Sequence, residues 1–227
     1  ERKDFEVDMG SEHMSLLMDM TLRDYSDVLA SSEPAPGGGS TAALSGVLGA
    51  ALTMMVVNLS VGKKNYESLD EKIKSEFIKE AENVKALQKE LSGLVDEDTK
   101  AFNKFMEAVK LPKDTEEQKQ LRAEKMQEAS LYALQVPLKT AECCFRLLEN
   151  QGNIARYGNR NAVSDVGVGA LLTLSGLEGA ILNVNINLSG IEDEAVRSEA
   201  YDKCRRLSAE GRKLHSEILD IVNLRIG

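Results

Sequence analysis

The stretch GGGSTAALSGVLGAALTMMVVNLSVG, residues 37–62, contains no charged side chain and is followed at once by two lysines. It is long enough to cross a lipid bilayer, but Gly, Ala, Ser, Thr and Asn are as prominent in it as Leu and Val, so its tendency to insert is weak. A second low-charge segment, which ends at Gly190, includes Asp165 and Glu178, and each carboxylate is costly in lipid. We therefore predict two apolar helices, near 39–61 and 162–188, buried all round by other helices at the centre of an all-α bundle.

Small residues recur at the three-to-four spacing of one helical face in both segments. Such faces allow two helix backbones to approach closely, either within a subunit or across a dimer interface. The triple glycine at 37–39 has two compatible explanations: it lets another backbone pack tightly, or it exposes the N–H groups of a helix N-terminus to an anion or a carbonyl. The two faces consist of Gly39, Ala43, Gly46 and Ala50, and of Gly169, Thr173, Gly176 and Ala180.

The rest of the chain also follows helical periodicity. Aromatic residues are only 4% of the chain and Trp is absent, so the core must be aliphatic. The segment NVNINL, 183–188, alternates like a strand but continues a helical run, so we predict helix there as well. We predict one helical domain over residues 15–227, and we exclude residues 1–14, whose GSEHM resembles a cloning scar. Further helices are expected at about 21–31, 69–109, 114–148 with a kink at Pro137, and 193–224.

The charge and the cysteine pattern exclude several classes of protein. A net charge of −9 argues against nucleic acid as a partner, because binding to phosphates needs a basic face. The three cysteines lack CxxC spacing, which indicates buried thiols in a cytoplasmic protein rather than disulfides or a zinc site. His215 is the only histidine outside the excluded leader, so most metal and triad schemes are unavailable and we predict no metal. Carboxylates, lysines and amides must therefore carry any catalysis.

Two carboxylates lie where the pattern is otherwise apolar. Asp98 falls between Leu94 and Ala101 on the apolar stripe of its predicted helix, so it either faces a polar pocket or sits at the edge of the stripe. Asp165 is either the N-cap of the second apolar helix or, if Ser164 is the cap, a carboxylate beside a glycine-lined helix start. In that second case a perturbed pKa is expected.

Amides and lysines provide further candidates. Asn58, Asn183 and Asn187 lie within the apolar helices, where they either form hydrogen bonds between helices or contact a polar ligand. Lys63, Lys64 and Tyr66 follow the first apolar helix. The two lysines either interact favourably with the dipole at the C-terminus of that helix or contribute to a binding site.

Five stretches of the chain share motifs with a known family: APGGGSTAALSGVLGAAL (35–52), NLSVGKKNY (58–66), DTKAFNKFMEAVKLPK (98–113), QEASLYALQVPL (127–138) and GNRNAVSDVGVGALL…GAILNVNINL (158–188). Together they resemble the cyclodeaminase and methenyltetrahydrofolate cyclohydrolase branch of the formiminotransferase-cyclodeaminase family. The similarity runs in order from about Met20 to the C-terminus. The formiminotransferase domain of longer relatives has no counterpart here, so we expect no transfer of a formimino group.

The resemblance implies an all-helical, dimeric enzyme that acts on tetrahydrofolate carrying a one-carbon unit, with no cofactor beyond that substrate. It offers two reactions, cyclodeamination of 5-formiminotetrahydrofolate and hydrolysis of 5,10-methenyltetrahydrofolate to 10-formyltetrahydrofolate. Resemblance and residue chemistry together indicate Asp165 and Asp98 as catalytic groups. Lys63 and Lys64, with Arg156 or Arg160, are expected to attract the anionic folate tail. The candidates for substrate binding are Gly37, Gly38, Gly39, Ser40, Asn58, Lys63, Lys64, Tyr66, Asn183 and Asn187.

A different class of protein remains open: a non-catalytic helical oligomer that acts as a scaffold, or a module that binds a small molecule. The scaffold hypothesis predicts no deep polar pocket where the two glycine-rich helices start. The enzyme hypothesis predicts such a pocket, and predicts that it contains Asp165. The sequence leaves cyclohydrolase and cyclodeaminase as alternatives, because both reactions need the same pocket.

Overall fold

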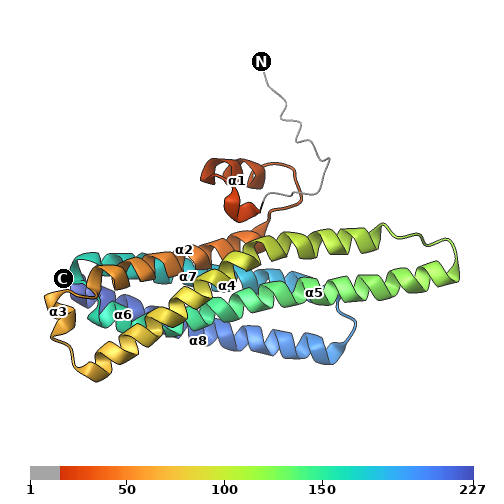
Figure 1. Ribbon diagram of the computed structural model, residues 1–227. Helices are drawn as coiled ribbons and strands as arrows, with labels where there is room; N and C mark the ends of the chain where they lie inside the picture. Colours follow the sequence, from red (N-terminus) through yellow and green to blue (C-terminus); the bar gives the residue numbers. More distant parts are fainter. Residues whose placement is uncertain (1–15) are drawn as a thin grey trace, which may run out of the picture.

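A computed structural model describes residues 16–227, so the predicted leader at 1–14 and His13 lie outside the described residues. Every regular element within 16–227 is helical, which confirms the all-α prediction (Figure 1). The α-helices are α1 (Leu22–Leu29), α2 (Gly38–Ser60), α3 (Lys64–Glu67), α4 (Glu71–Val109), α5 (Glu116–Glu149), α6 (Gly152–Tyr157), α7 (Val163–Asn187) and α8 (Glu194–Ile226), with short 3₁₀ turns at Leu17–Asp19 (η1), Arg160–Ala162 (η2) and Leu188–Gly190 (η3).

The centre of the fold is the antiparallel pair α2 and α7. A Cβ placed on Gly49 would lie 2.3 Å from Thr173 Oγ1 and 2.7 Å from the carbonyl oxygen of Gly169. A Cβ on Gly176 would lie 2.7 Å from the carbonyl oxygen of Ala42. Because backbone cannot move aside as a flexible side chain can, these glycines set how closely the two helices approach. The small-residue faces therefore form a contact within the subunit.

A buried polar group fixes the alignment of this pair. Gln151, which has 0% exposure, donates hydrogen bonds from Nε2 to Thr53 Oγ1 at 2.8 Å and to Thr173 Oγ1 at 3.2 Å. Each threonine hydroxyl in turn donates to a carbonyl four residues earlier in its own helix, Gly49 for Thr53 and Gly169 for Thr173. One amide thus connects α2, α7 and the α5–α6 turn, and sliding either helix along the other breaks these bonds.

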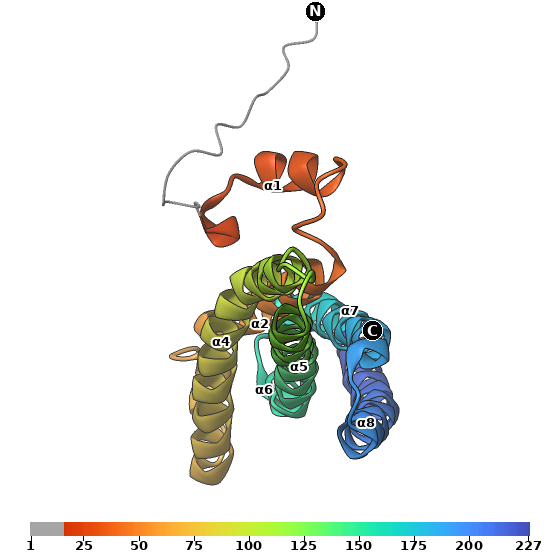
Figure 2. The same ribbon diagram turned by 90° about the vertical axis from the view of Figure 1, so that its right-hand side faces the viewer.

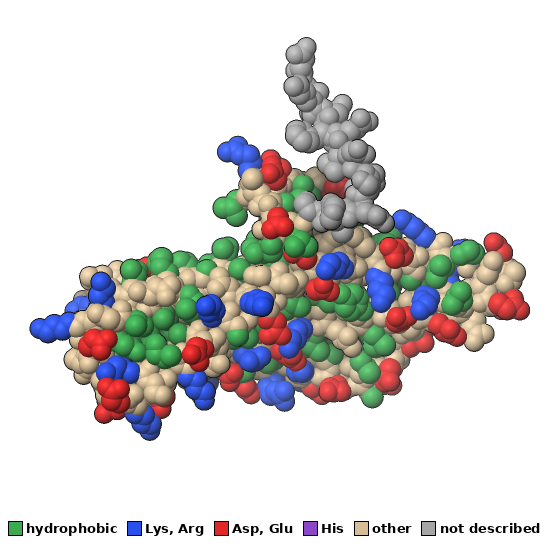
Figure 3. Space-filling view, in the orientation of Figure 1, with side chains coloured by type: hydrophobic (Ala, Val, Ile, Leu, Met, Phe, Trp, Pro, Cys, Tyr) green, Lys and Arg blue, Asp and Glu red, His purple; other side chains and the backbone are tan. Residues whose placement is uncertain are grey.

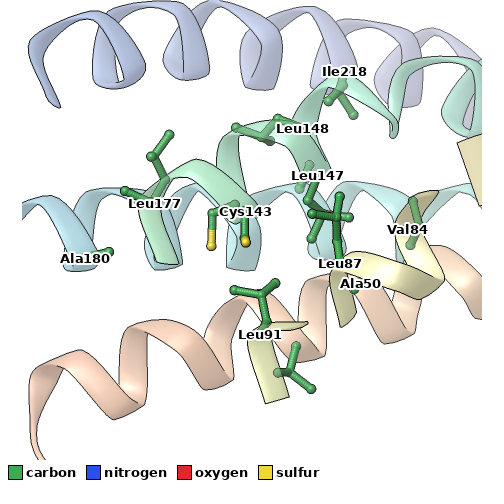
Figure 4. Packing of buried hydrophobic residues seen from close by; sticks show 14 of the residues in the cluster. Ala50, Val84, Leu87, Leu91, Cys143, Leu147, Leu148, Leu177, Ala180 and Ile218 are labelled. Atoms are coloured by element: carbon green, nitrogen blue, oxygen red, sulfur yellow. The ribbon is translucent and has the colours of Figure 1, made fainter. Parts of the chain in front are cut away.

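Three long helices cover one side of the central pair. Figure 2 looks along the bundle and shows α4, α5 and α8 fanning out beneath α2 and α7. The core between the layers is aliphatic, as predicted, with Leu91 of α4, Leu147 of α5, Leu177 of α7 and Ile218 of α8 at most 2% exposed (Figure 4). The three cysteines are free and buried, as the sequence predicted.

Among residues 16–227, only the protruding α1 lies over the opposite side of α2 and α7 (Figure 2). The prediction that these helices are buried all round is therefore wrong for the single chain. Both are long and apolar enough to cross a membrane, but half of each apolar window is buried against other helices. The exposed apolar side chains define an outer face, made of Leu48, Met55 and Leu59 on α2 and of Val168, Leu171, Leu182 and Ile186 on α7.

Most helix boundaries agree with the capping residues in the sequence. Thr21 accepts a hydrogen bond from the N–H of Asp24 at the start of α1. Thr115 forms a reciprocal capping box with Gln118 at the start of α5. The start of α7 differs from the prediction, because its N-cap is Ala162, which makes no side-chain cap, so neither Ser164 nor Asp165 has the capping role. The structure also adds the short helix α6, in a region for which the sequence analysis predicts no helix.

The close contact at Gly49 predicts a large difference between two glycine-to-alanine substitutions. Gly49→Ala should lower the free energy of unfolding by about 1–3 kcal/mol, because the new methyl group overlaps backbone of α7. Gly93→Ala is the matched control: Gly93 lies within α4 with nothing within 4 Å of its Cβ position, so alanine should add about 0.5–1 kcal/mol of stability. Urea unfolding measures both. Equal midpoints for the two variants would contradict the proposed packing.

Candidate active site

A cavity of about 330 Å³ opens where α2 begins and α7 ends. The loop before α2 forms one wall, α4 and α5 form two others, and the last turn of α7 with the following 3₁₀ turn closes the fourth. Among residues 16–227, Asp98 is the single charged side chain in its lining. The lining residues are Pro34, Ala35, Gly37, Gly38, Gly39, Asp98, Ala101, Phe102, Phe105, Ser130, Ala133, Asn183, Ile186, Asn187, Ser189 and Gly190.

The Asp98 carboxylate lies directly against the N-terminus of α2. Its Oδ2 accepts hydrogen bonds from the backbone N–H of Ser40 at 2.9 Å and from Ser40 Oγ at 3.1 Å. A Cβ on Gly39 would lie 2.0 Å from Asp98 Oδ1, so only glycine leaves room for this carboxylate. The glycines at 37–39 therefore leave room for an anion at the N-terminus of α2, which is one of the two explanations offered for the triple glycine. The anion is the Asp98 side chain of the protein itself.

Burial raises the pKa of the Asp98 carboxyl above its usual range, and the side-chain and backbone hydrogen bonds from Ser40 oppose that rise. Within the described part of the chain, no lysine, arginine or histidine lines the cavity with it. A carboxyl group with a raised pKa exchanges protons more readily near neutral pH than an exposed aspartate does. Asp98 therefore faces a polar pocket from the apolar stripe of α4, and does not simply lie at the edge of that stripe.

Asn187 replaces a helical hydrogen bond that Pro137 removes from α5. Proline has no N–H, so the carbonyl of Ala133, four residues earlier, loses its helical donor. Asn187 Nδ2 donates to that carbonyl oxygen at 2.8 Å from the end of α7. This is the interhelical role considered for the amides. The proline was a usable signal, since the carbonyl four residues before it needs a donor from another helix.

Asn183 presents an amide to the cavity. Its Nδ2 donates to the carbonyl of Gly179 in its own helix at 2.8 Å. A Cβ on Gly38 would lie 3.3 Å from the same Nδ2, so the amide also touches the start of α2. Asn183 Oδ1 accepts no hydrogen bond from any residue in 16–227, and it is therefore available to a donor on a ligand.

Two aromatic side chains in the cavity were missed by the sequence reasoning. Phe102 and Phe105 follow Asp98 by four and seven residues, so the three side chains share one face of α4. Flat apolar rings beside a carboxylate and an amide form a surface on which a planar ring can stack. The helical spacing from Asp98 was the signal that could have identified them.

The structure separates the other predicted binding residues from this cavity. Asn58, Lys63 and Lys64 are exposed at the opposite end of α2. Tyr66 is buried there, with its ring 5.4 Å from that of Phe77. Within one chain they do not line the cavity, because the full length of α2 lies between them and its glycine-rich start.

Asp165 also lies away from the cavity. Because α2 and α7 are antiparallel, their starts are at opposite ends of the molecule, and the pocket that we predicted where both helices start does not form in one chain. Asp165 precedes Asn183 by eighteen residues of one helix, about 27 Å at a rise of 1.5 Å per residue. The expectation that Asp165 and Asp98 share a pocket is therefore wrong for residues of the same chain.

Comparison with known proteins agrees with this architecture. A family model described as formiminotransferase-cyclodeaminase matches residues 21–206. The chain belongs to the formiminotransferase-cyclodeaminase family. The resemblance that the sequence motifs indicated is confirmed.

The relatives of this chain include a cyclohydrolase and several cyclodeaminases. The methenyltetrahydrofolate cyclohydrolase of Methylorubrum extorquens is 39% identical over 206 residues, which cover 91% of this chain and 97% of that protein. The formimidoyltransferase-cyclodeaminase of Mus musculus is 34% identical over 96% of this chain, which spans only 39% of that protein. The crystal structure of formiminotetrahydrofolate cyclodeaminase from Thermotoga maritima has a TM-score of 0.79 at 26% identity, and the match covers 92% of this chain and 98% of that one.

The pairing of Asn187 with Pro137 predicts coupled effects on stability. Asn187→Leu should cost about 1–3 kcal/mol, because the partly buried carbonyl of Ala133 is left without a donor. In a Pro137→Ala background the new N–H at position 137 can reach that carbonyl, so the cost of Asn187→Leu should fall by at least about 1 kcal/mol.

Asn183→Leu is the control for this double-mutant cycle, because its amide bonds a carbonyl of its own helix. Its cost should not depend on position 137. Urea unfolding of the four variants in each cycle provides the measurement. Additive costs for Asn187→Leu and Pro137→Ala would show that the amide does not replace the missing helical bond.

Proposed function

We propose that this chain is a folate one-carbon enzyme whose reaction takes place at Asp98, and that it hydrolyses 5,10-methenyltetrahydrofolate. The observation that carries the proposal is a carboxylate in a cavity to which residues 16–227 contribute no other charge, flanked by aromatic rings and an amide. The methenyl group makes its substrate a cation, and an anionic group in a pocket of low polarity attracts a cation strongly. The similarity to a cyclohydrolase along nearly the whole chain supports this choice of reaction.

The carboxylate of Asp98 can act as the general base. Water adds to the carbon that bridges N5 and N10, a C–O bond forms, and a proton passes from the water to Asp98. The tetrahedral carbon then breaks its bond to N5 as the remaining hydroxyl proton departs. One of these two protons ends on N5 and the other is released, so the cation and water yield 10-formyltetrahydrofolate and one proton.

The neighbours of Asp98 suit this role. The two hydrogen bonds from Ser40 hold Oδ2 in place, and Oδ1, which lies against Gly39, accepts no hydrogen bond from residues 16–227. Phe102 and Phe105 provide surface for the flat pterin or aminobenzoyl ring. Asn183 Oδ1 can accept a hydrogen bond from the amino group of the pterin. No step of this scheme requires a group that the chain lacks.

Cyclodeamination is the second candidate, and the likeness to the Thermotoga maritima enzyme favours it. In that reaction N10 attacks the formimino carbon, and the N10 proton passes through the same carboxyl group to the formimino nitrogen. With one further proton taken up, that nitrogen leaves as ammonia and the methenyl cation remains. One assay separates the two. The protein is added to 5,10-methenyltetrahydrofolate and to 5-formiminotetrahydrofolate while the methenyl absorbance is followed. Loss of absorbance with the first substrate identifies a cyclohydrolase, gain with the second identifies a cyclodeaminase, and no change with either refutes both.

Replacing Asp98 should stop the reaction without unfolding the protein. Asp98→Asn keeps an oxygen that can accept from Ser40 but removes the base, so kcat should fall at least about a hundredfold. Glu82→Gln, an exposed carboxylate of the same helix, is the control and should keep the turnover of the wild type. A folded Asp98→Asn variant with near-normal kcat would move the chemistry elsewhere.

The protein is also proposed to be a cytoplasmic homodimer, free of membrane and nucleic acid. Support for the dimer comes from the outer face, where Leu171, Leu182 and Ile186 are 51%, 69% and 72% exposed. Two copies that meet through these faces remove that apolar surface from water. Sedimentation at several protein concentrations measures this state, and a monomer at every concentration would contradict it.

A further inference from the structure

One hydroxyl in the cavity wall is buried but makes no hydrogen bond with residues 16–227. Ser130 of α5 lines the cavity and is 7% exposed. Its Oγ is not fully enclosed by the core, so a molecule in the cavity can reach it. Buried polar groups in proteins are nearly always bonded, because an unpartnered one is costly. The Ser130 hydroxyl is therefore available to a ligand.

The other buried serine and threonine hydroxyls within 16–227 all have partners. Ser40 donates to Asp98, and the remaining four donate to the carbonyl four residues earlier in their own helices. Ser130 does not make that bond with Met126, and its Oγ lies instead beside Gly190, where an added Cβ would be 3.2 Å away. Those four residues are Thr53, Ser60, Thr140 and Thr173. The Ser130 hydroxyl is thus the exception among the buried hydroxyls of these helices.

Contacts between the antiparallel helices α4 and α5 fix the level of Ser130 in the cavity (Figure 1). One contact lies on each side of Ser130 along α5, and together they place it opposite residues 99–102 of α4. That segment begins directly after Asp98 and ends about 6 Å further along the helix axis. The two contacts are Tyr132 with Glu97 and Glu128 with Lys104. Ser130 therefore faces the cavity about one helical turn from the carboxylate.

The charged side chains of α4 and α5 at this level do not enter the cavity. Lys100 pairs with Glu97 at 2.7 Å and Lys104 with Glu128 at 3.6 Å, and all four side chains are more than a third exposed. Figure 3 shows cations and carboxylates side by side along the outer surface of these helices. Recognition next to Ser130 must then depend on neutral hydrogen-bonding groups.

Two amide oxygens complete the polar set in the cavity. Asn187 Nδ2 donates to the carbonyl of Ala133, so the amide orientation is fixed and Oδ1 is the atom left over. Asn183 lies one turn earlier on the same face of α7, and its Oδ1 is also unbonded within 16–227. The cavity thus offers two acceptors on α7 and, on α5, a hydroxyl that can donate.

The polar edge of a pterin ring matches this set. It combines a 4-oxo acceptor with the N–H donors of the adjoining ring nitrogen and of the amino substituent. Amide oxygens accept from such donors, and a hydroxyl donates to such an oxo group. The aminobenzoyl ring of a folate has no edge of this kind. A site with unbonded polar groups selects the ring that satisfies them, because any other ring leaves them buried and unpaired.

We infer that Ser130 determines specificity for the pterin ring, by donating a hydrogen bond from its hydroxyl to the 4-oxo oxygen. The pterin then lies between the α5 wall and the amides of α7, with the methenyl carbon toward Asp98. The inference deepens the proposed function and rests on it. It assigns the pterin, rather than the aminobenzoyl ring, to the space beside Ser130.

Ser130→Ala separates this role from a structural one. The variant should lower kcat/KM for 5,10-methenyltetrahydrofolate about five- to tenfold, because one hydrogen bond to the substrate is lost. Its urea unfolding midpoint should be unchanged or higher, since no group of residues 16–227 loses a partner. A normal kcat/KM would overturn the inference, and so would a lower unfolding midpoint accompanied by normal affinity for substrate.

Ser92→Ala is the matched control, because it makes the same chemical change on a helix that also lines the cavity. Ser92 Oγ donates to the carbonyl of Gln88 in its own helix at 2.8 Å, and Ser92 is not part of the cavity lining. Its kcat/KM should equal that of the wild type. A loss equal to that of Ser130→Ala would show that removing any helical serine hydroxyl has this effect, and would overturn the inference.

Fragments of the substrate locate the contact without any turnover. Calorimetry measures the Kd of a tetrahydropterin that lacks the aminobenzoyl and glutamyl groups, and the Kd of p-aminobenzoylglutamate. Ser130→Ala should weaken binding of the tetrahydropterin about five- to tenfold and leave that of p-aminobenzoylglutamate unchanged. The reverse pattern, equal losses for the two fragments, or no binding of the tetrahydropterin to the wild type would each overturn the inference.

The calorimetric result also distinguishes failure of the inference from failure of the proposed function. A wild-type protein that binds the tetrahydropterin through Ser130 but converts neither folate refutes the proposed reaction and leaves the pterin contact standing. A wild-type protein that converts a folate, with a Ser130→Ala variant of unaltered kinetics and tetrahydropterin affinity, refutes the inference alone.

Discussion

The approach of α2 to α7 through glycine is the constraint on which the rest of the structure depends. Gly49 and Gly176 each lie against backbone of the other helix, and Gln151 fixes the alignment by bonding a threonine on both. With that alignment set, the start of α2 meets the end of α7, and the cavity is bounded by both. A longer side chain at the contact would separate the helices and widen the cavity as well as cost stability.

The position of the Asp98 carboxylate depends in turn on where α2 begins. Ser40 lies in the first turn of α2, where the backbone N–H has no helical partner, and Asp98 of α4 satisfies it. The carboxylate that we propose as the catalytic base therefore also stabilises a helix end. This dual use explains why the carboxylate can remain in an apolar wall: two hydrogen bonds and the positive end of the helix offset part of the cost of burying it.

Much of the fold could be predicted from sequence, because periodicity and capping are local signals. The low charge and the small-residue spacing indicated both central helices, and the predicted start near residue 114 agrees with the start of α5 at Glu116. The direction in which two helices pair is a tertiary property that no local pattern contains, so Asp165 was placed with Asp98 when the antiparallel pair sets them apart. Phe105 was overlooked as a site residue for a related reason. An aromatic residue on the apolar stripe of a helix is expected to be core, and only the tertiary structure shows that it lines a cavity. The exposure of the outer face could not be predicted either, because it depends on which side of α2 and α7 the other helices cover.

The bond between Asn187 and the carbonyl of Ala133 has a consequence for how this sequence can change over time. The amide is needed because Pro137 interrupts α5, and the proline is tolerated because the amide is present. Position 187 is then not free to change first: a chain that loses the amide while it keeps the proline carries an unsatisfied carbonyl, whereas a chain that loses the proline first does not. Substitutions at the two positions should therefore accumulate in a preferred order, with position 137 changing before position 187.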